Sequence, residues 1–219
     1  MAAPLSVTVT VVFDERCLLH ATPEADHVES AHRITAIFHR LRLHGVLGDR
    51  VHVVPARLAT DEELLAVHSR AHLQRIAALD LRSDSRHDAL VDDAAALSPA
   101  LAARLHLEPV AAPALVAAVT AGKMVDWSLS PRGERDTYAT PATPAVARLS
   151  AGGVLVAVDA VATAASPVAF TILRPPGHHC HTAKAGGFCY FANVAIAAAY
   201  ARRVHGLRRV AIVDWDVHH

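Results

Sequence analysis

The sequence predicts an α/β fold in which helices cover both faces of a mostly parallel sheet. Short apolar strands alternate with longer helical segments, and residues 168–213 read as a strand, a loop, a helix and a second strand. Such a crossover joins parallel strands. The strands at 168–173 and 209–213 are almost continuously apolar, which is typical of a sheet covered on both faces. We therefore expect a three-layer α/β/α architecture.

The composition indicates one globular domain spanning residues 1–219. Of these 219 residues, 53% are hydrophobic and 19% are charged, so a core can form. Lysine plus arginine equals aspartate plus glutamate at 21 each, which gives no net charge to attract nucleic acid or an anionic membrane. No run of about 18 uncharged apolar residues occurs, so we expect no membrane span.

The three cysteines indicate a reducing compartment. Cys17, Cys180 and Cys189 form no C-x-x-C pair, and their odd number argues against a disulfide framework. The N-terminus lacks the basic region of a signal peptide. We expect a cytoplasmic or nuclear location, and targeting to an organelle stays open.

Local signals predict the remaining elements. Helix periodicity and strand alternation place strands at 7–13 and 51–54 and helices at 28–44, 60–79, 145–163 and 193–205. Thr60 and Glu63 form a capping box, and Gly45 suits a helix C-terminus. Gly152 and Gly153 should let their helix pack closely. Residues 82–93 and 130–144 read as loops, and residues 94–121 have a helical tendency.

Two carboxylates and a histidine follow the last predicted strand. Asp214, Asp216 and His218 alternate along the chain, so an extended backbone directs all three to one face. The carboxyl end of a parallel strand is where open α/β sheets place their sites. Oxygen and imidazole nitrogen are ordinary zinc ligands. By position, Asp216 and His218 can reach an ion beyond the strand, and Asp214 lies deeper. The alternative is a strand end with solvated acids.

The loop after the strand at 168–173 carries a second cluster. Residues 174–179 read Arg-Pro-Pro-Gly-His-His, and the prolines restrict the backbone that holds His178 and His179. A histidine held in this way suits a general base, because it titrates near neutrality. Asp214 is a candidate to orient one of the two imidazoles. The alternative is a surface loop that happens to carry histidines.

Glycines followed by aromatic residues form a third element at 186–191. Such a stretch can line a narrow apolar slot, and the alternative is ordinary packing at a helix start.

Taken together, these motifs resemble the histone deacetylase family, closest to its class II and its plant or bacterial relatives. The resemblance rests on R-P-P-G-H-H at 174–179, G-F-C-Y-F-x-N-V-A-I-A-A at 187–198 and V-D-W-D-V-H-H at 213–219. Weaker similarity touches 26–33, 67–69, 136–138 and 151–153. The resemblance implies the arginase/deacetylase-like form of the three-layer fold.

The resemblance also implies roles for individual residues. It implies that Asp216 and His218 are two of three zinc ligands, that His179 is the general base, and that His178 is its partner with Asp214 behind it. It implies a potassium site at Asp214 and at the backbone of Asp216 and His218.

Further implied roles concern substrate and partners. Gly187 and Phe188 match the wall of the tunnel that grips the acetyl-lysine stem, and Arg33 matches an arginine at its inner end. The implied activity is hydrolysis of acetyl-lysine on histones or other proteins, typical of a chromatin regulator. The implied partners are acetylated proteins or peptides, with a corepressor or a second deacetylase as a further candidate.

This sequence departs from the family pattern in several places. Val28, Gly186 and Ala192 replace a proline, a methionine and an asparagine. The family's third zinc ligand, an aspartate, and its carbonyl-polarising tyrosine or histidine come after the position of His219. The 219 residues therefore match the N-terminal portion of the domain, and we expect this chain alone to bind zinc poorly and to be inactive.

Three alternatives stay open. The first is a deacetylase of small molecules such as acetylated polyamines. The second is an arginase-like hydrolase with two manganese ions, against which R-P-P-G-H-H argues. The third is a non-catalytic interaction module.

Overall fold

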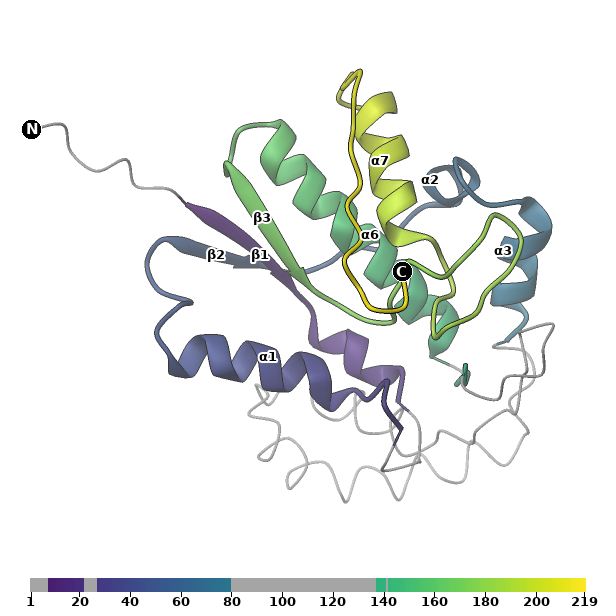
Figure 1. Cartoon of the computed structure of the whole chain (residues 1–219), viewed down its shortest axis with the longest axis horizontal. Helices are drawn as coiled ribbons and strands as arrows, with labels where there is room; N and C mark the ends of the chain where they lie inside the picture. Colours follow the sequence, from purple (N-terminus) through teal and green to yellow (C-terminus); the bar gives the residue numbers. More distant parts are fainter. Residues whose placement is uncertain (1–7, 22–26, 80–136, 141) are drawn as a thin grey trace, which may run out of the picture.

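A three-stranded parallel sheet lies at the centre of the structure (Figure 1). The structure is a computed structural model, and it describes residues 8–21, 27–79, 137–140 and 142–219. The strands are β1 (Val9–Phe13), β2 (Val51–Val54) and β3 (Val168–Ile172), in the spatial order β2-β1-β3. The predicted strands at 7–13, 51–54 and 168–173 are thus confirmed to within two residues. The predictions for 82–93, 94–121 and 130–136 lie outside the described residues.

Helices cover both faces of β1. On one face, the ring of Phe13 stacks on Phe38 of α1 (His32–Leu43), with 4.0 Å between the ring centroids. On the other face, Gly153 of α6 (Thr143–Ala162) packs against Val12. Successive side chains of a strand point to opposite faces, so α1 and α6 form separate layers. The predicted three-layer α/β/α architecture is confirmed.

The two adjacent glycines of α6 permit close packing, as predicted. A Cβ on Gly152 would lie 2.0 Å from the carbonyl oxygen of Arg57, and one on Gly153 would lie 2.4 Å from Leu173 Cδ1. Neither distance is compatible with a side chain. α6 therefore sits directly on the segment after β2 and on the end of β3.

The predicted helix at 60–79 is two helices, so that prediction was wrong. The capping box of Thr60 and Glu63 is confirmed and opens α2 (Asp61–Leu65). Ser69 then caps a new helix, α3 (Arg70–Ala77), by accepting a bond from the His72 backbone N–H at 3.2 Å. The Ser69 N–H donates to the Thr182 carbonyl at 3.0 Å, which a continuous helix would prevent. A 3-10 helix, η1 (Glu15–Leu19), precedes α1, and α7 (Asn193–Arg203) follows the loop after β3.

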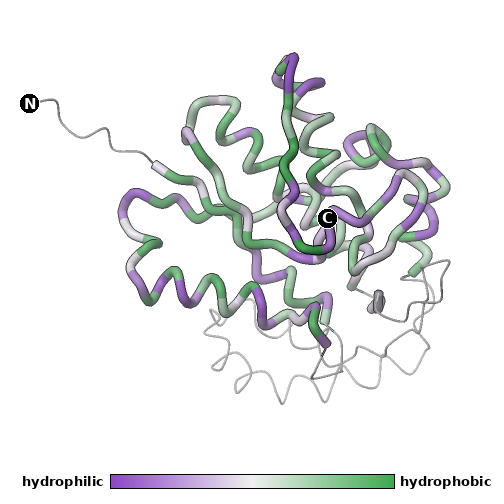
Figure 2. The backbone as a smooth tube through the Cα atoms, in the orientation of Figure 1, coloured by the Kyte–Doolittle hydropathy of each residue, from purple (hydrophilic) through white to green (hydrophobic). Residues whose placement is uncertain are grey.

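The predicted strand at 209–213 is absent, which is a second correction. Among the described residues, no backbone hydrogen bond joins this segment to β3, and a strand requires such a ladder. Its apolar side chains are largely exposed, with Val213 at 79%. Figure 2 shows the segment as a mostly hydrophobic stretch between polar ends.

α6 is the one described helix that is long and apolar enough to cross a membrane. Half of its most apolar window is buried inside the structure. Its two charged side chains bond to neighbouring residues, Arg148 to Asp61 at 2.6 Å and Asp159 to His205 at 2.7 Å. These contacts are those of a core helix.

Candidate active site

Two segments far apart in the sequence meet beyond the carboxyl end of β3. One is the loop that follows β3, and the other is the C-terminal segment, drawn in yellow in Figure 1. They are joined by a bond of 3.0 Å between Nδ1 of His178 and Oδ2 of Asp214. This contact places Asp214 beside the first histidine of the pair.

The second histidine of the pair faces the remaining candidate residues. The rings of His178 and His179 have centroids 4.0 Å apart, and those of His179 and His218 lie 6.5 Å apart. Oδ1 of Asp216 lies 3.4 Å from Nδ1 of His218. The structure therefore gathers all five candidate catalytic and metal-binding side chains at one place.

The surroundings of His179 keep its imidazole neutral at pH 7. Burial lowers the pKa of His179, and the neighbouring His178 and His218 lower it further. The carboxylates of Asp216 and Asp214 oppose this shift but do not reverse it. A neutral imidazole can accept a proton, so His179 has the protonation state that a general base requires.

Asp216 and His218 suit a zinc ion by their chemistry and spacing. Two ligands of a tetrahedral zinc lie about 3.4 Å apart, given bonds of about 2.0–2.1 Å, and the Asp216–His218 pair has this separation. The backbone N–H of His218 lowers the pKa of Asp216, which keeps the carboxylate ionised for binding. No other histidine, cysteine or acid in the described ranges forms a compact group of three with this pair.

The polypeptide turns sharply at Gly187 and Phe188, against the face of His179. Both residues have a positive φ, +53° for Gly187 and +66° for Phe188. A Cβ on Gly187 would lie 2.4 Å from Cδ2 of the His179 ring. The Phe188 N–H donates to Oγ1 of Thr137 at 3.1 Å. The rings of Phe188 and His27 form a T-shaped pair with centroids 5.5 Å apart. Gly187 therefore sets how closely the backbone approaches the candidate base.

Replacing Gly187 with alanine is expected to lower kcat/KM by about 100-fold for any reaction in which His179 acts as the base. The added methyl group must displace His179, and a misplacement of about 1 Å at a catalytic group can cost that factor. The control is Gly186→Ala, because a Cβ at Gly186 meets nothing within 4 Å. Steady-state kinetics of the two variants test the prediction, and equal activities would contradict it.

The loop that carries the histidines is anchored at its start by a buried arginine. Arg174 forms an ion pair with Glu29, and both side chains are almost fully buried. Its guanidinium also donates to the Cys17 carbonyl at 3.1 Å and to the Tyr138 hydroxyl oxygen at 2.6 Å. The guanidinium contacts the His20 carbonyl as well. Arg174 thus ties the loop to η1 and to the segment before α1.

The loop is held a second time at the start of α7. The carbonyl of Pro175 accepts bonds from Ser150 Oγ at 2.9 Å and from Asn193 Nδ2 at 3.3 Å. Gly177 lies so close to Asn193 that a Cβ would be 2.6 Å from the Asn193 backbone nitrogen. The backbone before His178 and His179 is therefore fixed from two sides.

A fully buried histidine, His20, lies next to Arg174 and makes the free energy of unfolding depend on pH. His20 stacks on Tyr138 with centroids 4.5 Å apart and bonds to Thr143 Oγ1 at 2.8 Å. Burial lowers its pKa well below 6.5, and the nearby Arg174 and His27 lower it further. The carboxylate of Glu29 also faces it, at 3.9 Å. The folded protein therefore keeps His20 neutral at pH values where the unfolded chain protonates it.

The free energy of unfolding is expected to fall as pH drops below about 6.5. In that range the unfolded state binds one more proton than the folded state at His20, so each pH unit costs up to about 1.4 kcal/mol. Urea unfolding at pH 7, 6 and 5 measures the slope. The His20→Gln variant, which keeps a polar group near Thr143, should have a smaller slope. An unchanged slope in that variant would rule out His20 as a source.

A cavity of about 470 Å³ adjoins the site. It lies between the loop, the start of α7 and the C-terminal segment, and its lining includes His178, Asp214 and Asp216. Gly187 and Phe188, the predicted tunnel wall, do not line this cavity. Gly187 lies against His179 instead.

Sequence reasoning missed one buried arginine and one cluster of metal-binding side chains. Arg33 is exposed on α1, and the arginine buried behind the site is Arg174. The cluster comprises His68, His72 and Cys180, all buried. The spacing of His68 and His72, four residues apart, was a visible signal, but their proximity to Cys180 depends on the tertiary fold.

Comparison with known proteins identifies the family. Residues 27–219 match the family described as the histone deacetylase domain. The chain is 38% identical over 203 residues to human polyamine deacetylase HDAC10, covering 92% of this chain and 24% of that protein. It is 33% identical over 223 residues to the histone deacetylase-like amidohydrolase of Pseudomonas aeruginosa, covering 94% and 46%.

A solved structure of the family has the same fold. The HDA15 HD domain superposes with a TM-score of 0.63 and 26% identity, covering 89% of this chain and 43% of that one. The chain thus spans from about a quarter to just under half the length of these relatives. The family match extends over most of the chain and includes both segments of the candidate site, so the chain belongs to the histone deacetylase family.

Proposed function

We propose that the protein is a zinc-dependent deacetylase that hydrolyses acetyl-lysine in proteins or peptides. The observation that carries the proposal is the 3.0 Å bond between His178 and Asp214 beside a neutral His179. It supports an arrangement in which an acid orients one histidine and the second histidine is free to accept a proton, which suits general-base catalysis of amide hydrolysis. Membership of the family supports the same reaction class.

The proposed mechanism assigns a step to each residue. Asp216 and His218 would hold zinc, which would supply Lewis-acid polarisation of the acetyl carbonyl and acidify the attacking water. His179 accepts the proton of that water and returns it to the departing lysine amine. Asp214 orients His178, whose ring packs on His179 and limits its movement. The products are acetate and a free lysine side chain.

A second candidate substrate is an acetylated polyamine. The human relative at 38% identity is named a polyamine deacetylase, which favours this candidate. Both substrates present an acetylated primary amine on a flexible aliphatic chain, so the same hydrolytic site serves either. They differ at the far end of that chain, which carries a peptide backbone in one substrate and a second cationic amine in the other.

The decisive experiment compares the two substrates on the purified protein. We expect a higher kcat/KM for an acetyl-lysine peptide than for acetylated spermidine. We also expect activity to be lost after chelation and restored by added zinc. Preference for the polyamine would move the assignment to the second candidate. Absence of turnover of both substrates with zinc present would refute the proposed activity.

Several associated properties are proposals of the same kind. Potassium binding at Asp214 and at the backbone of Asp216 and His218 accords with the oxygen-rich end of the site. A role in chromatin regulation, a corepressor or deacetylase partner, and a cytoplasmic or nuclear location follow from the family. Measurement of activity with and without potassium tests the first, and fractionation of the native host cell tests the last.

A further inference from the structure

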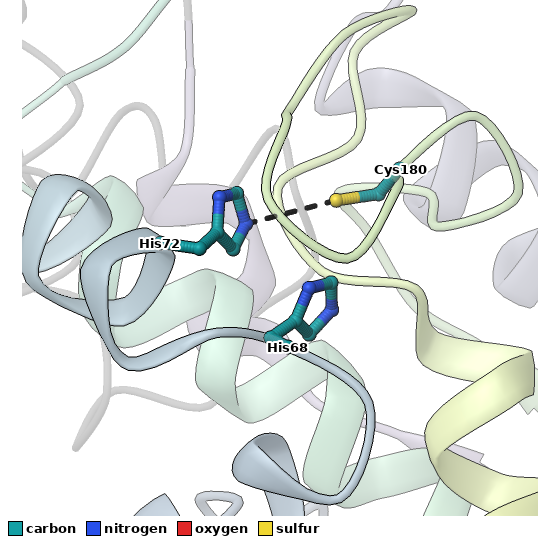
Figure 3. Close-up of side chains that lie close together, drawn as sticks. All are labelled: His68, His72 and Cys180. Carbon is teal, nitrogen blue, oxygen red and sulfur yellow. Dashed lines mark hydrogen bonds between the residues drawn. The ribbon is translucent and has the colours of Figure 1, made fainter.

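Three metal-binding side chains converge in the interior, outside the candidate active site. His68 lies just before α3, His72 lies within it, and Cys180 belongs to the loop after β3 (Figure 3). All three are buried, and their donor atoms lie within 4.8 Å of one another. Buried polar groups are the informative ones, so two buried imidazoles beside a buried thiol call for an explanation.

The spacing of the cluster is close to that of a metal site. Cys180 Sγ lies 3.8 Å from His72 Nε2. A tetrahedral zinc with bonds of about 2.3 Å to sulfur and 2.0–2.1 Å to nitrogen places those two ligands about 3.5 Å apart. The rings of His68 and His72 stack with centroids 4.7 Å apart, and one nitrogen of each ring lies within 4.8 Å of the other ligand atoms. A shift of a few tenths of an ångström brings the sulfur and nitrogen to bonding geometry.

We propose that His68, His72 and Cys180 form a second, structural metal site that takes a zinc-class transition-metal ion. Two imidazoles and one thiolate are ligands for Zn²⁺ and for other borderline or soft ions, and they do not suit Mg²⁺ or Ca²⁺. The site shares no residue with the Asp216–His218 pair. It is therefore independent of the proposed catalytic zinc.

The hydrogen bonds of the cluster show how an ion would enter. The Tyr190 carbonyl accepts from His72 Nε2 at 2.8 Å and from Cys180 Sγ at 3.1 Å. On binding, the thiol loses its proton to solvent and a sulfur–metal bond forms. The ring proton of His72 moves to Nδ1, where the Ala183 carbonyl can accept it. The Tyr190 oxygen, already close to both donors, is then placed to serve as the fourth ligand.

His68 is oriented for the same purpose by its other ring nitrogen. Its Nδ1 bonds to the Thr182 carbonyl at 3.2 Å, which directs Nε2 away from that carbonyl. Nε2 accepts the Ala192 backbone N–H at 2.9 Å, and this bond gives way when the ion binds. A backbone carbonyl behind each imidazole is the usual arrangement around metal-ligating histidines.

The site would couple α3 to the candidate catalytic loop. Cys180 directly follows His179 in the sequence, and the two histidine ligands come from α3 and the residues just before it. An ion held by all three would cross-link these elements behind His179. The inferred role is to position the loop, separately from any chemistry at the substrate.

Cobalt titration of the purified metal-free protein tests the proposal. Cobalt bound by a thiolate gives a sulfur-to-metal charge-transfer band in the near ultraviolet, whereas the Asp216–His218 site contains no sulfur. We expect this band to saturate with one equivalent of Co²⁺ and to be absent in Cys180→Ser. The control is Cys17→Ala, because Cys17 is also buried but lies in a different part of the core. That variant should keep the band.

A second variant keeps the test decisive if Cys180→Ser does not fold. His72→Gln retains a side-chain donor for the Tyr190 carbonyl but loses the imidazole, so cobalt affinity measured from the band should fall by about tenfold or more. Circular dichroism confirms that each variant is folded. The proposal is overturned if folded wild-type protein gives no thiolate band, if the band survives in folded Cys180→Ser, or if His72→Gln binds cobalt as tightly as wild type.

Discussion

Replacing His179 with alanine is expected to lower kcat of the proposed deacetylation by about 10²–10⁴-fold, the usual contribution of a general base. The imidazole is neutral at pH 7 because burial and two neighbouring histidines lower its pKa. Its ring also lies next to the rings of His178 and His218, with centroid distances of 4.0 and 6.5 Å. Removing it leaves the other site residues in place, so KM should change far less than kcat. Steady-state kinetics on an acetylated peptide measure both constants.

The control for this prediction is His181→Ala. His181 lies two residues along the same loop, but it is exposed, and its backbone makes the bonds to Lys184 that shape the loop. Loss of its imidazole should leave kcat within about twofold of wild type, since surface substitutions away from special contacts are usually mild. Equal losses in the two variants would point to a general disturbance of the loop and would contradict a specific role for His179.

The sequence predicted the layers of the fold because the spacing of apolar residues shows which face of a strand or helix is buried. Three of the four predicted strands and the glycine pair of α6 appeared where expected, and the capping box of Thr60 and Glu63 formed as expected, whereas the strand at 209–213 did not form. Two of the errors came from contacts with residues far away in the sequence. Glu29 was assigned to a helix start, but it pairs with Arg174, and α1 begins at His32. Ser69 caps a new helix instead of continuing the previous one.

The sequence was sufficient to predict the residues of the candidate site. It was not sufficient to predict the contacts that hold those residues in place. The motifs themselves contain the site residues His178, His179, Asp214, Asp216 and His218, and the structure brings these together. The contact of Gly187 with the face of His179 depends on backbone angles that the sequence does not display. The cluster around His72 depends on α3 meeting the loop after β3, a long-range contact without local periodicity.

Replacing Glu29 with glutamine is expected to destabilise the protein by about 3–5 kcal/mol, because it leaves the charge of Arg174 buried without its partner. The two side chains are 1% and 2% exposed, so water cannot replace the lost carboxylate. The Tyr138 hydroxyl donates to Oε2 of Glu29 at 3.2 Å and loses a charged acceptor as well. Urea unfolding at pH 7 measures the change in free energy.

The same substitution at Glu62 separates burial from charge. Glu62 pairs with Arg203 at 2.7 Å, but the two side chains are 82% and 50% exposed. Exposed pairs contribute about 0–1 kcal/mol, so Glu62→Gln should change stability by no more than that. If Glu29→Gln costs as little as Glu62→Gln, the carbonyls of Cys17 and His20 are sufficient to hold Arg174. A large cost that disappears when Arg174 is also replaced by methionine would show instead that the penalty is the unpaired buried charge. The start of the His178–His179 loop would then depend on that ion pair.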